Sequence, residues 1–272
     1  MNKPLLIEFE VTCVDRSGAT ARLTLEPVGG ATMPMPAPGQ FVNILVEHAH
    51  NTFLRRPISV NFAEPGSLML MVKEAGEGTA VLVNSLPGDR YNILMPLGHG
   101  FTLPEKPEKC LLIGGGVGVA PLLYLGECLR QRGVEPVFVL GARNRKELDW
   151  QLPDFEKIGK TFVATEDGSL GTKGFVTQCP ALDLEADRWY VCGPMPMMKA
   201  VAAAARKRNV ECEVSLENKM ACGLGACLCC VEDTADSGNV CTCTEGPVFN
   251  KHLIKGSNIE KLADEILSII KN

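Results

Sequence analysis

The sequence lacks two features that would each assign the chain to a broad class of protein. It has no excess of positive charge, since 27 Lys and Arg stand against 32 Asp and Glu, for a net charge of −5. A general nucleic-acid binder needs a basic face that releases phosphate counterions, so we expect no nucleic-acid partner. No apolar run approaches the roughly 18 residues that span a bilayer, so we also expect no membrane segment.

We expect no secretory signal either, because Glu8 interrupts the N-terminal apolar stretch before a signal-peptide core could form. With 46% hydrophobic and 22% charged residues, the composition excludes disorder and collagen-like repetition. A length of 272 residues suits one large domain or two ordinary ones. We therefore expect a folded protein that works in the cytoplasm.

The hydrophobic pattern changes near residue 100 and divides the chain into four parts. Residues 1–100 carry short apolar or alternating runs between Pro and Gly breakers, which predicts a small antiparallel β-barrel. Residues 101–214 alternate apolar strands with helical patterns, which predicts a Rossmann-like, doubly wound parallel sheet. Residues 215–256 are rich in Gly and Cys, and residues 257–272 have the apolar spacing of a helix. The fold class is thus mixed β and α/β.

The individual elements follow from the same pattern. The predicted strands are Ile7–Val14, Ala21–Leu25, Phe41–Val46, Ser67–Lys73, Cys110–Ile113, Pro136–Leu140, Thr161–Ala164, Trp189–Cys192 and Val210–Val214. The predicted helices in the second part are Pro121–Arg132 and Met197–Arg208.

Cysteine is abundant and unevenly placed. Six of the 12 cysteines lie between residues 222 and 243. In a reducing compartment such crowding favours metal ligation over disulfides. The others are typical of small buried side chains, with Cys192 set apart for its position.

The crowded cysteines have the C-x4-C-x2-C…C spacing of a plant-type [2Fe–2S] site. Gly223 and Gly225 suit such a site, because they let the chain wrap tightly and bring backbone N–H groups to sulfur. The predicted ligands are Cys222, Cys227, Cys230 and Cys243.

Two questions remain open from spacing alone. Cys229 and Cys241 are predicted to be non-ligands, but Cys241 could replace Cys243 as the fourth ligand. A structural zinc site is the alternative to a cluster. Cys227 and Cys230 have the spacing of a zinc-binding pair, whereas Cys241 and Cys243 are too close to form the second pair.

A glycine-rich turn follows one predicted strand and opens a predicted helix, where a pyrophosphate would meet N–H groups and the positive helix end. Its glycines are Gly114, Gly115, Gly116 and Gly118. The turn departs from G-x-G-x-x-G, because Val119 occupies the third glycine position, and no ribose-binding acid ends the next strand. Arg143 follows that strand and is either a 2′-phosphate ligand or an ordinary surface residue. The turn predicts nucleotide binding without identifying the nucleotide.

A second signal lies at Cys192 and Gly193, between a predicted strand and a helix. Ligands of open α/β sheets lie beyond the carboxyl ends of the strands, so these residues could face the nucleotide. The alternative is a buried thiol followed by a helix-initiating proline.

The barrel part holds candidates for flavin binding. Arg56 offers a forked donor for a pyrophosphate, and Ser59 offers a hydroxyl for the polar edge of a flavin, on a segment that Pro57 makes rigid. Gly78 and Thr79 are suited to close approach of a phosphate. Taken singly, each is equally typical of a turn or a surface side chain.

Five motifs occur together in the order found in ferredoxin reductase-like flavoproteins. The chain resembles that family, and within it the electron-transfer subunits of type B dihydroorotate dehydrogenase, over roughly residues 5–255. The motifs are Arg56–Ser59, Gly76-x-Gly78-Thr79, Gly114–Pro121, Cys192-Gly-Pro194 and the cysteine segment that closes with Cys243–Phe249.

The resemblance implies FAD on the barrel, NAD on the Rossmann-like half and a C-terminal [2Fe–2S] cluster with Cys243 as fourth ligand. It implies that Arg56, Pro57, Ile58, Ser59, Met71, Val72 and Lys73 contact the flavin, and that Gly78 and Thr79 meet its phosphates. It further implies an FMN-containing, dihydroorotate-oxidising partner subunit in a heterotetramer with two copies of each chain. The biochemical role would be electron transfer in pyrimidine (UMP) biosynthesis.

The cofactor set is chemically consistent, because a cluster passes single electrons, NAD⁺ accepts two as hydride, and a flavin holds one or two. Such a chain needs no acid–base residue, and we name no catalytic side chain. Two alternatives remain. One is a subunit of an NAD(P)H–ferredoxin oxidoreductase with the same fold, and the other is a nucleotide-binding regulatory protein with structural zinc.

Overall fold

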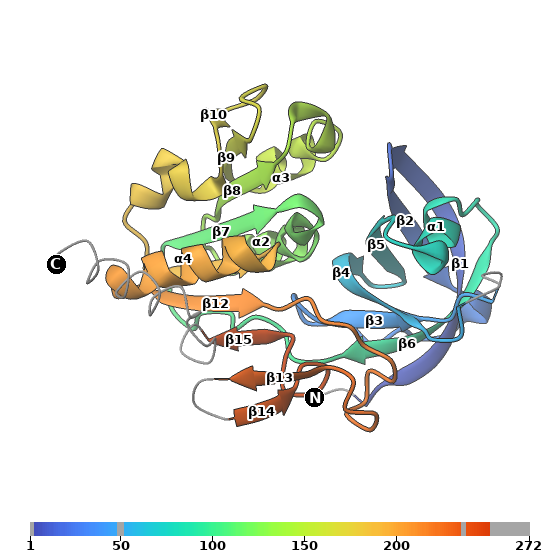
Figure 1. Cartoon of the computed structure of the whole chain (residues 1–272). Coiled ribbons are helices and arrows are strands. Elements are labelled where there is room, and N and C mark those ends of the chain that lie inside the picture. The colour runs from blue at the N-terminus through green and yellow to red at the C-terminus, as the bar shows by residue number, and fades with distance from the viewer. Residues whose placement is uncertain (1–2, 48–51, 235–237, 251–272) are drawn as a thin grey trace, which may run out of the picture.

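The computed structural model describes residues 3–47, 52–234 and 238–250. Figure 1 shows two halves side by side, a barrel and a sheet flanked by helices, with the cysteine segment running below both. The N-terminal half contains β1 (Leu5–Ser17), β2 (Thr20–Pro27), β3 (Phe41–Ile44), β4 (Arg56–Glu64), β5 (Ser67–Lys73), α1 (Glu77–Val83) and β6 (Arg90–Leu97).

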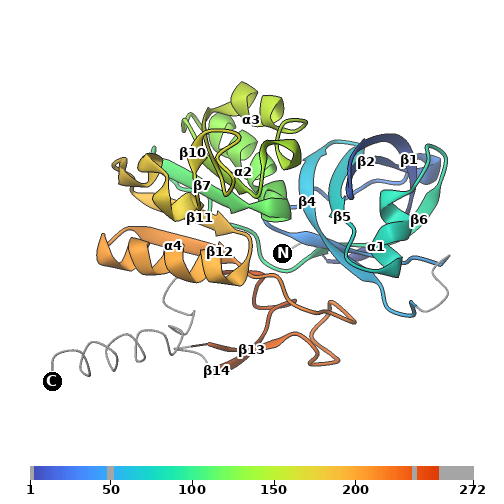
Figure 2. The ribbon, with the colours of Figure 1, turned by 45° about the horizontal axis from the view of Figure 1, so that its top comes forward.

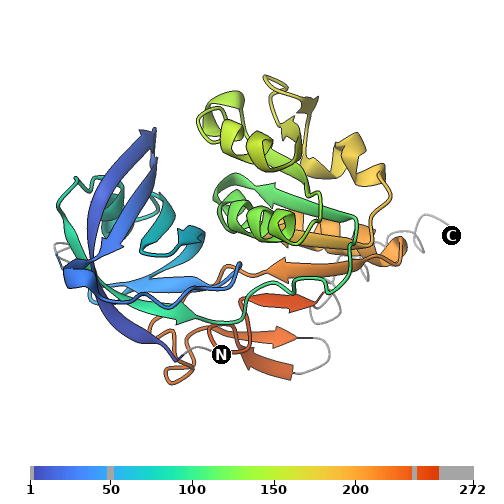
Figure 3. The same ribbon diagram turned by 180° about the vertical axis from the view of Figure 1, so that it is seen from behind.

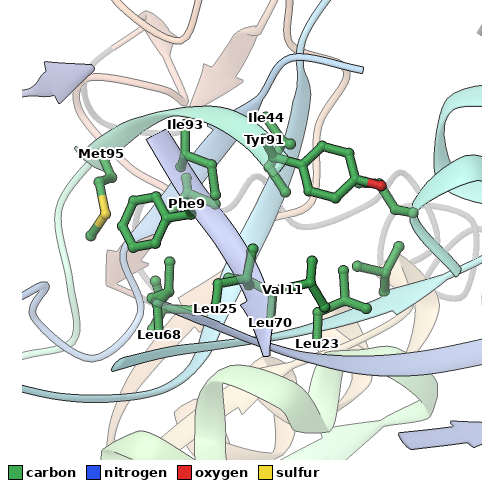
Figure 4. Packing of buried hydrophobic residues seen from close by; sticks show 14 of the residues in the cluster. Phe9, Val11, Leu23, Leu25, Ile44, Leu68, Leu70, Tyr91, Ile93 and Met95 are labelled. Carbon is green, nitrogen blue, oxygen red and sulfur yellow. The ribbon is translucent and has the colours of Figure 1, made fainter. Parts of the chain in front are cut away.

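The first six strands close into an antiparallel barrel in the order β1-β2-β5-β4-β3-β6. Closure follows from alternation along the strands, which sends every second side chain inward. In β1, for example, Ile7, Phe9 and Val11 are buried while Glu8 is exposed. Figure 4 shows such side chains from neighbouring strands meeting in the interior, among them Leu23 from β2.

The second half is a seven-stranded sheet in the order β10-β9-β8-β7-β11-β12-β15. Its strands are β7 (Cys110–Gly115), β8 (Val137–Ala142), β9 (Lys160–Thr165), β10 (Thr172–Lys173), β11 (Arg188–Cys192), β12 (Glu211–Ser215) and β15 (Val248–Asn250). All neighbouring strands are parallel except β15, which runs antiparallel to β12. The predicted doubly wound parallel sheet is therefore confirmed.

Helices cover both faces of this sheet, as Figure 2 shows. One face packs on α2 (Ala120–Gln131) and α3 (Leu152–Ile158), and the other on α4 (Met195–Lys207). The central strands β7 and β8 are therefore covered on both sides and consist of apolar residues and glycine. The chain leaves β7 toward β8 and later returns to the other side of β7 as β11, so the strand order reverses at this point. Such a switch point is where open α/β sheets bind ligands.

The cysteine segment forms a hairpin of β13 (Val231–Thr234) and β14 (Gly238–Cys241) before entering the large sheet as β15. Seen from behind in Figure 3, its orange and red strands lie along the edge of the sheet and below the barrel. The segment after residue 214 is thus joined to the nucleotide half by strand pairing. The helix predicted for residues 257–272 lies outside the described residues.

All nine predicted strands and both predicted helices are present, with ends that differ by a few residues. The hydrophobic pattern did not predict β4, β6, β10, β15, α1, α3 or the hairpin β13–β14. Each is short or carries polar residues on its exposed side, so its pattern is too weak to distinguish it from a loop. In the part of the chain that the structure describes, no helix has the length and apolar character needed to cross a bilayer.

Helix α2 holds the two halves together. The Asn61 side chain of β4 donates a hydrogen bond to the Ala120 carbonyl at 2.9 Å. The rings of Phe62 and Tyr124 lie next to it with centroids 5.5 Å apart. These contacts place the glycine-rich turn that precedes α2 directly against the barrel strand that carries the flavin motif.

We expect the barrel core to dominate the stability of the N-terminal half. Leu70 is fully buried, so Leu70→Ala should lower the free energy of unfolding by about 2–5 kcal/mol through lost burial and a residual cavity. Leu86 is 60% exposed, so Leu86→Ala should change the free energy of unfolding by less than about 0.5 kcal/mol. Urea titration of both variants measures the difference, and equal losses would contradict this account of the core.

Candidate functional site

The four predicted cluster ligands come together in two pairs. The thiol of Cys222 lies within hydrogen-bonding reach of Cys227, and the thiol of Cys243 lies within reach of Cys230. Each iron of a [2Fe–2S] cluster takes two of the four thiolates, so two neighbouring pairs are the arrangement this cluster requires. Among the described residues, no three His, Cys, Asp or Glu side chains converge on a point that could hold a single ion. The pairing of the four thiols is the observation that fits a [2Fe–2S] cluster.

Backbone N–H groups point at the sulfur atoms of these cysteines. Leu224 N–H lies 3.3 Å from Cys222 Sγ, and Gly225 N–H lies 3.2 Å from Cys243 Sγ. The left-handed conformations of Gly223 (φ 72°) and Gly225 (φ 78°) turn the chain so that this is possible. N–H groups aimed at thiolate sulfur stabilise negative charge there, and cluster potentials depend on such contacts.

The two halves of the site differ in electrostatics. Desolvation raises the pKa of the Cys222 thiol, but N–H donors from Leu224, Cys227 and Ala226 outweigh it and lower the pKa to about 7. Burial and the neighbouring Cys230 instead raise the pKa of Cys243 to about 12. The surroundings of Cys222 therefore favour the thiolate form more than those of Cys243 do.

The remaining two cysteines of the segment differ in position. Cys229 is exposed, and its Sγ lies 3.7 Å from the Lys219 carbonyl, away from the paired thiols. Cys241 lies close to Cys230, and burial is the largest cause of its raised pKa. Geometry thus keeps Cys241 in reach of the site, while Cys243 is the more deeply buried of the two.

A cleft of about 370 Å³ runs between the barrel and the glycine-rich turn. Six of the predicted flavin contacts line it: Pro57, Ile58, Ser59, Met71, Lys73 and Thr79. Arg56 and Gly78 are not among the lining residues, but they lie against each other, since a Cβ on Gly78 would come 2.5 Å from Arg56 Nε. Gly78 therefore leaves room for a guanidinium beside the N-terminal turn of α1, which is the cradle that a pyrophosphate needs.

The surroundings of two predicted contacts, Val72 and Thr79, limit how each could meet a flavin. The Val72 side chain points into the barrel core, so it could meet a flavin through backbone atoms alone. The Thr79 hydroxyl accepts hydrogen bonds from the N–H groups of Ala75 (2.8 Å) and Gly76 (3.1 Å) and donates to the Gly76 carbonyl. It therefore shapes the loop rather than presenting a free donor to a phosphate.

A second cleft, of about 510 Å³, lies at the carboxyl ends of β7, β8 and β9. Gly115 and Gly116 line it, together with Pro194 at the start of α4. Gly118 and Gly193 lie where the turn meets the loop after β11, and a Cβ on Gly118 would come 2.5 Å from Gly193 Cα. These glycines allow two loops to touch beside the cleft.

The other two predicted nucleotide residues serve packing. A Cβ on Gly114 would lie 2.9 Å from the side chains of Leu122 and Val119, so Gly114 brings α2 close to β7. Cys192 is buried in the apolar cluster that includes Phe101 and Tyr190. Burial raises the pKa of its thiol far above the usual range. Of the two interpretations left open by the sequence, the structure places this thiol as the buried side chain.

Acidic residues near the nucleotide cleft were missed by the sequence analysis. A turn after β8 returns Glu147 to the end of that strand, where its carboxylate accepts the Arg143 N–H at 3.2 Å. Glu147 and Glu166 both line the cleft beside Arg143. Carboxylates in this position bind ribose hydroxyls and repel a 2′-phosphate. Sequence spacing could not reveal Glu147, because the turn that brings it back has no strong signature.

Glu217 was also missed, although its place directly after β12 is a ligand-binding position in such sheets. It lines the flavin cleft opposite Lys73. Desolvation raises the pKa of the Glu217 carboxyl, and the Lys73 ammonium opposes that rise. Lys73 also lines the nucleotide cleft, so the two clefts meet at this side chain.

The flavin cleft and the cysteine pairs share walls. Phe41 and Met220 line the cleft and also belong to one apolar cluster with Cys230 and Cys243. The cluster site therefore lies directly behind the flavin cleft, with these two side chains between them.

The comparisons with known proteins agree with this arrangement. A family model described as the iron–sulfur cluster binding domain of dihydroorotate dehydrogenase B matches residues 217–255. A relative from Geobacillus thermodenitrificans, named dihydroorotate dehydrogenase B (NAD(+)), electron transfer subunit, is 41% identical over 85% of this chain and 90% of its own length. One of the same name from Fusobacterium nucleatum is 38% identical over 78% of this chain and 84% of its own length. The chain belongs to this family.

Solved structures place the family among flavin oxidoreductases. An NADH-dependent reduced ferredoxin–NADP oxidoreductase has a TM-score of 0.80 at 28% identity, covering 93% of this chain and 91% of that one. The flavohemoglobin of Malassezia yamatoensis, with FAD and heme bound, has a TM-score of 0.64 at 21% identity, covering 75% of this chain and 57% of that one, which shows a shared fold. The expected ferredoxin reductase-like barrel and Rossmann-like sheet are confirmed.

The fourth cluster ligand of this electron-transfer subunit can be tested by substitution. We expect Cys243→Ser to lose the cluster, so that iron and acid-labile sulfide fall to background and the EPR signal of the reduced protein disappears. Cys241→Ser should keep all three, because Cys243 is the more deeply buried partner of Cys230. The reverse pattern would make Cys241 the ligand, and Cys229→Ser serves as a control at an exposed thiol.

The role of Arg56 can be tested through flavin affinity. Removing a guanidinium that forms charge-assisted hydrogen bonds costs about 1.5–3 kcal/mol, so Arg56→Ala should raise the dissociation constant of FAD roughly 10- to 100-fold. Titration of the apoprotein with FAD, followed by flavin fluorescence, measures this change. Arg90 pairs with Glu10 on the outside of the barrel, so Arg90→Ala should leave the affinity unchanged. Equal effects of both variants would exclude a specific role for Arg56.

Proposed function

We propose that this chain carries electrons from an FMN-containing, dihydroorotate-oxidising partner through a [2Fe–2S] cluster and FAD to NAD⁺, in the pyrimidine (UMP) pathway. One observation carries the proposal: Phe41 and Met220 separate the flavin cleft from the cysteine pairs, and Lys73 lies where the flavin and nucleotide clefts meet. The three sites are therefore contiguous and in the order that the redox chemistry needs.

The bound cofactors supply the electron chemistry, since FAD can exchange one electron with a cluster and two with NAD⁺. The residues of this chain bind and orient them. Arg56 and Gly78 provide a place for the pyrophosphate, and the paired thiols bind the irons. Glu147 and Glu166 favour NAD over a 2′-phosphorylated dinucleotide.

The residue assignments are part of the proposal. The flavin contacts are Arg56, Pro57, Ile58, Ser59, Met71, Val72, Lys73, Gly78 and Thr79; the nucleotide contacts are Gly114, Gly115, Gly116, Gly118, Cys192 and Gly193; and the cluster ligands are Cys222, Cys227, Cys230 and Cys243. We assign residues 1–100 to the flavin half, 101–214 to the nucleotide half and 215–256 to the cluster segment. Val72, Gly114 and Cys192 would act through backbone atoms or packing.

We also propose a heterotetramer with two copies of this chain and two of the catalytic subunit, working in the cytoplasm. The family name designates a subunit, which requires a catalytic partner. The cysteine loop exposes Leu224 and Leu228 beside the cluster site, so a partner seated there would approach the irons. Size-exclusion chromatography with light scattering on the copurified complex measures the stoichiometry.

Reconstitution tests the function. With the FMN-containing partner present, we expect dihydroorotate to drive NADH formation, and this activity should be lost when Cys243→Ser replaces the wild-type chain. Reduction of a ferredoxin by NADH, without any response to dihydroorotate and the partner, would instead indicate the ferredoxin oxidoreductase function. A colourless protein containing zinc and no sulfide would contradict both.

A further inference from the structure

Asn43 is a buried polar side chain on β3 that neither the flavin motif nor the cysteine spacing explains. Its side chain is 0% exposed, and a buried amide is tolerated where it is hydrogen-bonded. Nδ2 lies 3.3 Å from the carbonyl oxygens of both Ala221 and Cys222. Since both partners are acceptors, the NH₂ side of the amide must face them.

The main chain of Asn43 belongs to the flavin-binding part of the barrel. In the pairing of β3 with β4, Asn43 lies opposite Pro57, the first of three consecutive β4 residues that line the flavin cleft. Its carbonyl oxygen accepts a hydrogen bond from Arg55 Nη1 at 3.2 Å. One residue thus pairs with the flavin-binding strand through its backbone and contacts the first cluster ligand through its side chain.

The cysteine loop is shaped to accept this side chain. Gly223, directly after Cys222, has φ 72°, and a Cβ there would lie 3.0 Å from Asn43 Nδ2 and 3.1 Å from Leu97 Cδ1. The loop therefore rests on Asn43 with no space for another atom. Because of this close contact, the position of β3 determines where Cys222 lies.

We propose that Asn43 is a positioning residue for electron transfer, because its amide holds Cys222, and with it the cluster, at a set place relative to the flavin-binding strand. The inference rests on the proposed function. Asn43 does not line the flavin cleft as described, so it acts through Cys222 rather than on a cofactor. Its removal should change the cluster and its exchange with the flavin, and spare the reaction between flavin and NADH.

The test compares Asn43→Asp and Asn43→Leu with Asn61→Asp in the full-length, cofactor-loaded chain. Asn61 is a matched control, since it is equally buried on the neighbouring strand and donates to one carbonyl, that of Ala120 in the nucleotide half. Asp removes the donor and adds an acceptor facing two carbonyls, whereas Leu removes the polar group at similar volume. If the buried carboxylate prevents Asn43→Asp from folding, Asn43→Leu still tests the proposal.

Three measurements separate positioning from a general structural role. Iron content and the EPR spectrum of the dithionite-reduced protein report the cluster, and stopped-flow absorbance follows NADH reduction first of the flavin and then of the cluster. In both Asn43 variants we expect a shifted EPR signal and a several-fold slower reduction of the cluster, with flavin reduction at the wild-type rate. Asn61→Asp should retain the wild-type iron content and EPR signal, because its hydrogen-bond partner lies in the nucleotide half.

The outcomes are distinct. Loss of iron from both Asn43 variants, with iron retained in Asn61→Asp, supports the same role, because it shows that the amide fixes Cys222. Wild-type iron content, EPR signal and cluster reduction in the Asn43 variants would overturn it. If the wild-type chain itself shows no [2Fe–2S] signal, the proposed function fails instead.

Discussion

The structure depends on the contact between the cysteine loop and the barrel. Phe41 and Met220 pack against Cys230 and Cys243 on one side and line the flavin cleft on the other. Apolar packing of this kind excludes water and holds the two sites at close range. Without it, the cysteine segment would be a separate metal-binding module. With it, the segment extends a flavoprotein, and a one-electron centre lies next to a two-electron one.

The nucleotide half contributes the second contact on which function depends. The glycine-rich turn has one side on each cleft, since Gly116 lines the nucleotide cleft and Val117 and Gly118 line the flavin cleft. Gly118 can do this because the loop after β11 also has a glycine at the point of closest approach. Helix α2, which begins at this turn, packs against β4 and fixes the angle between the halves. The flavin strand and the nucleotide turn therefore face each other as one unit.

Much of the candidate site could be predicted from the sequence, and the reason differs for each part. The cysteine spacing is specific because a cluster requires four thiolates on a chain that wraps within a few residues. The flavin motif was weak by itself, and its value came from its order with the other motifs. The resemblance implied that Thr79 meets a phosphate. In the structure its hydroxyl accepts hydrogen bonds from loop N–H groups, which no local sequence pattern reveals. Glu217 and Asn43 were missed because their partners, Lys73 and Cys222, lie far away in the sequence. Glu147 was missed because the turn that returns it to Arg143 has no strong signature.

The sequence by itself predicted nine of the strands and two of the helices, a change of pattern near residue 100 and a group of candidate cysteine ligands. These properties depend on local hydrophobic period, glycine and proline placement, and spacing within a single loop. The tertiary structure decided which thiols pair, which side chains line both clefts, and how the cysteine segment reaches the barrel. The cleft linings and the contact of the cysteine segment with the barrel arise from packing between residues more than a hundred positions apart, as between Asn43 and Cys222, and no local pattern in the chain encodes such a contact.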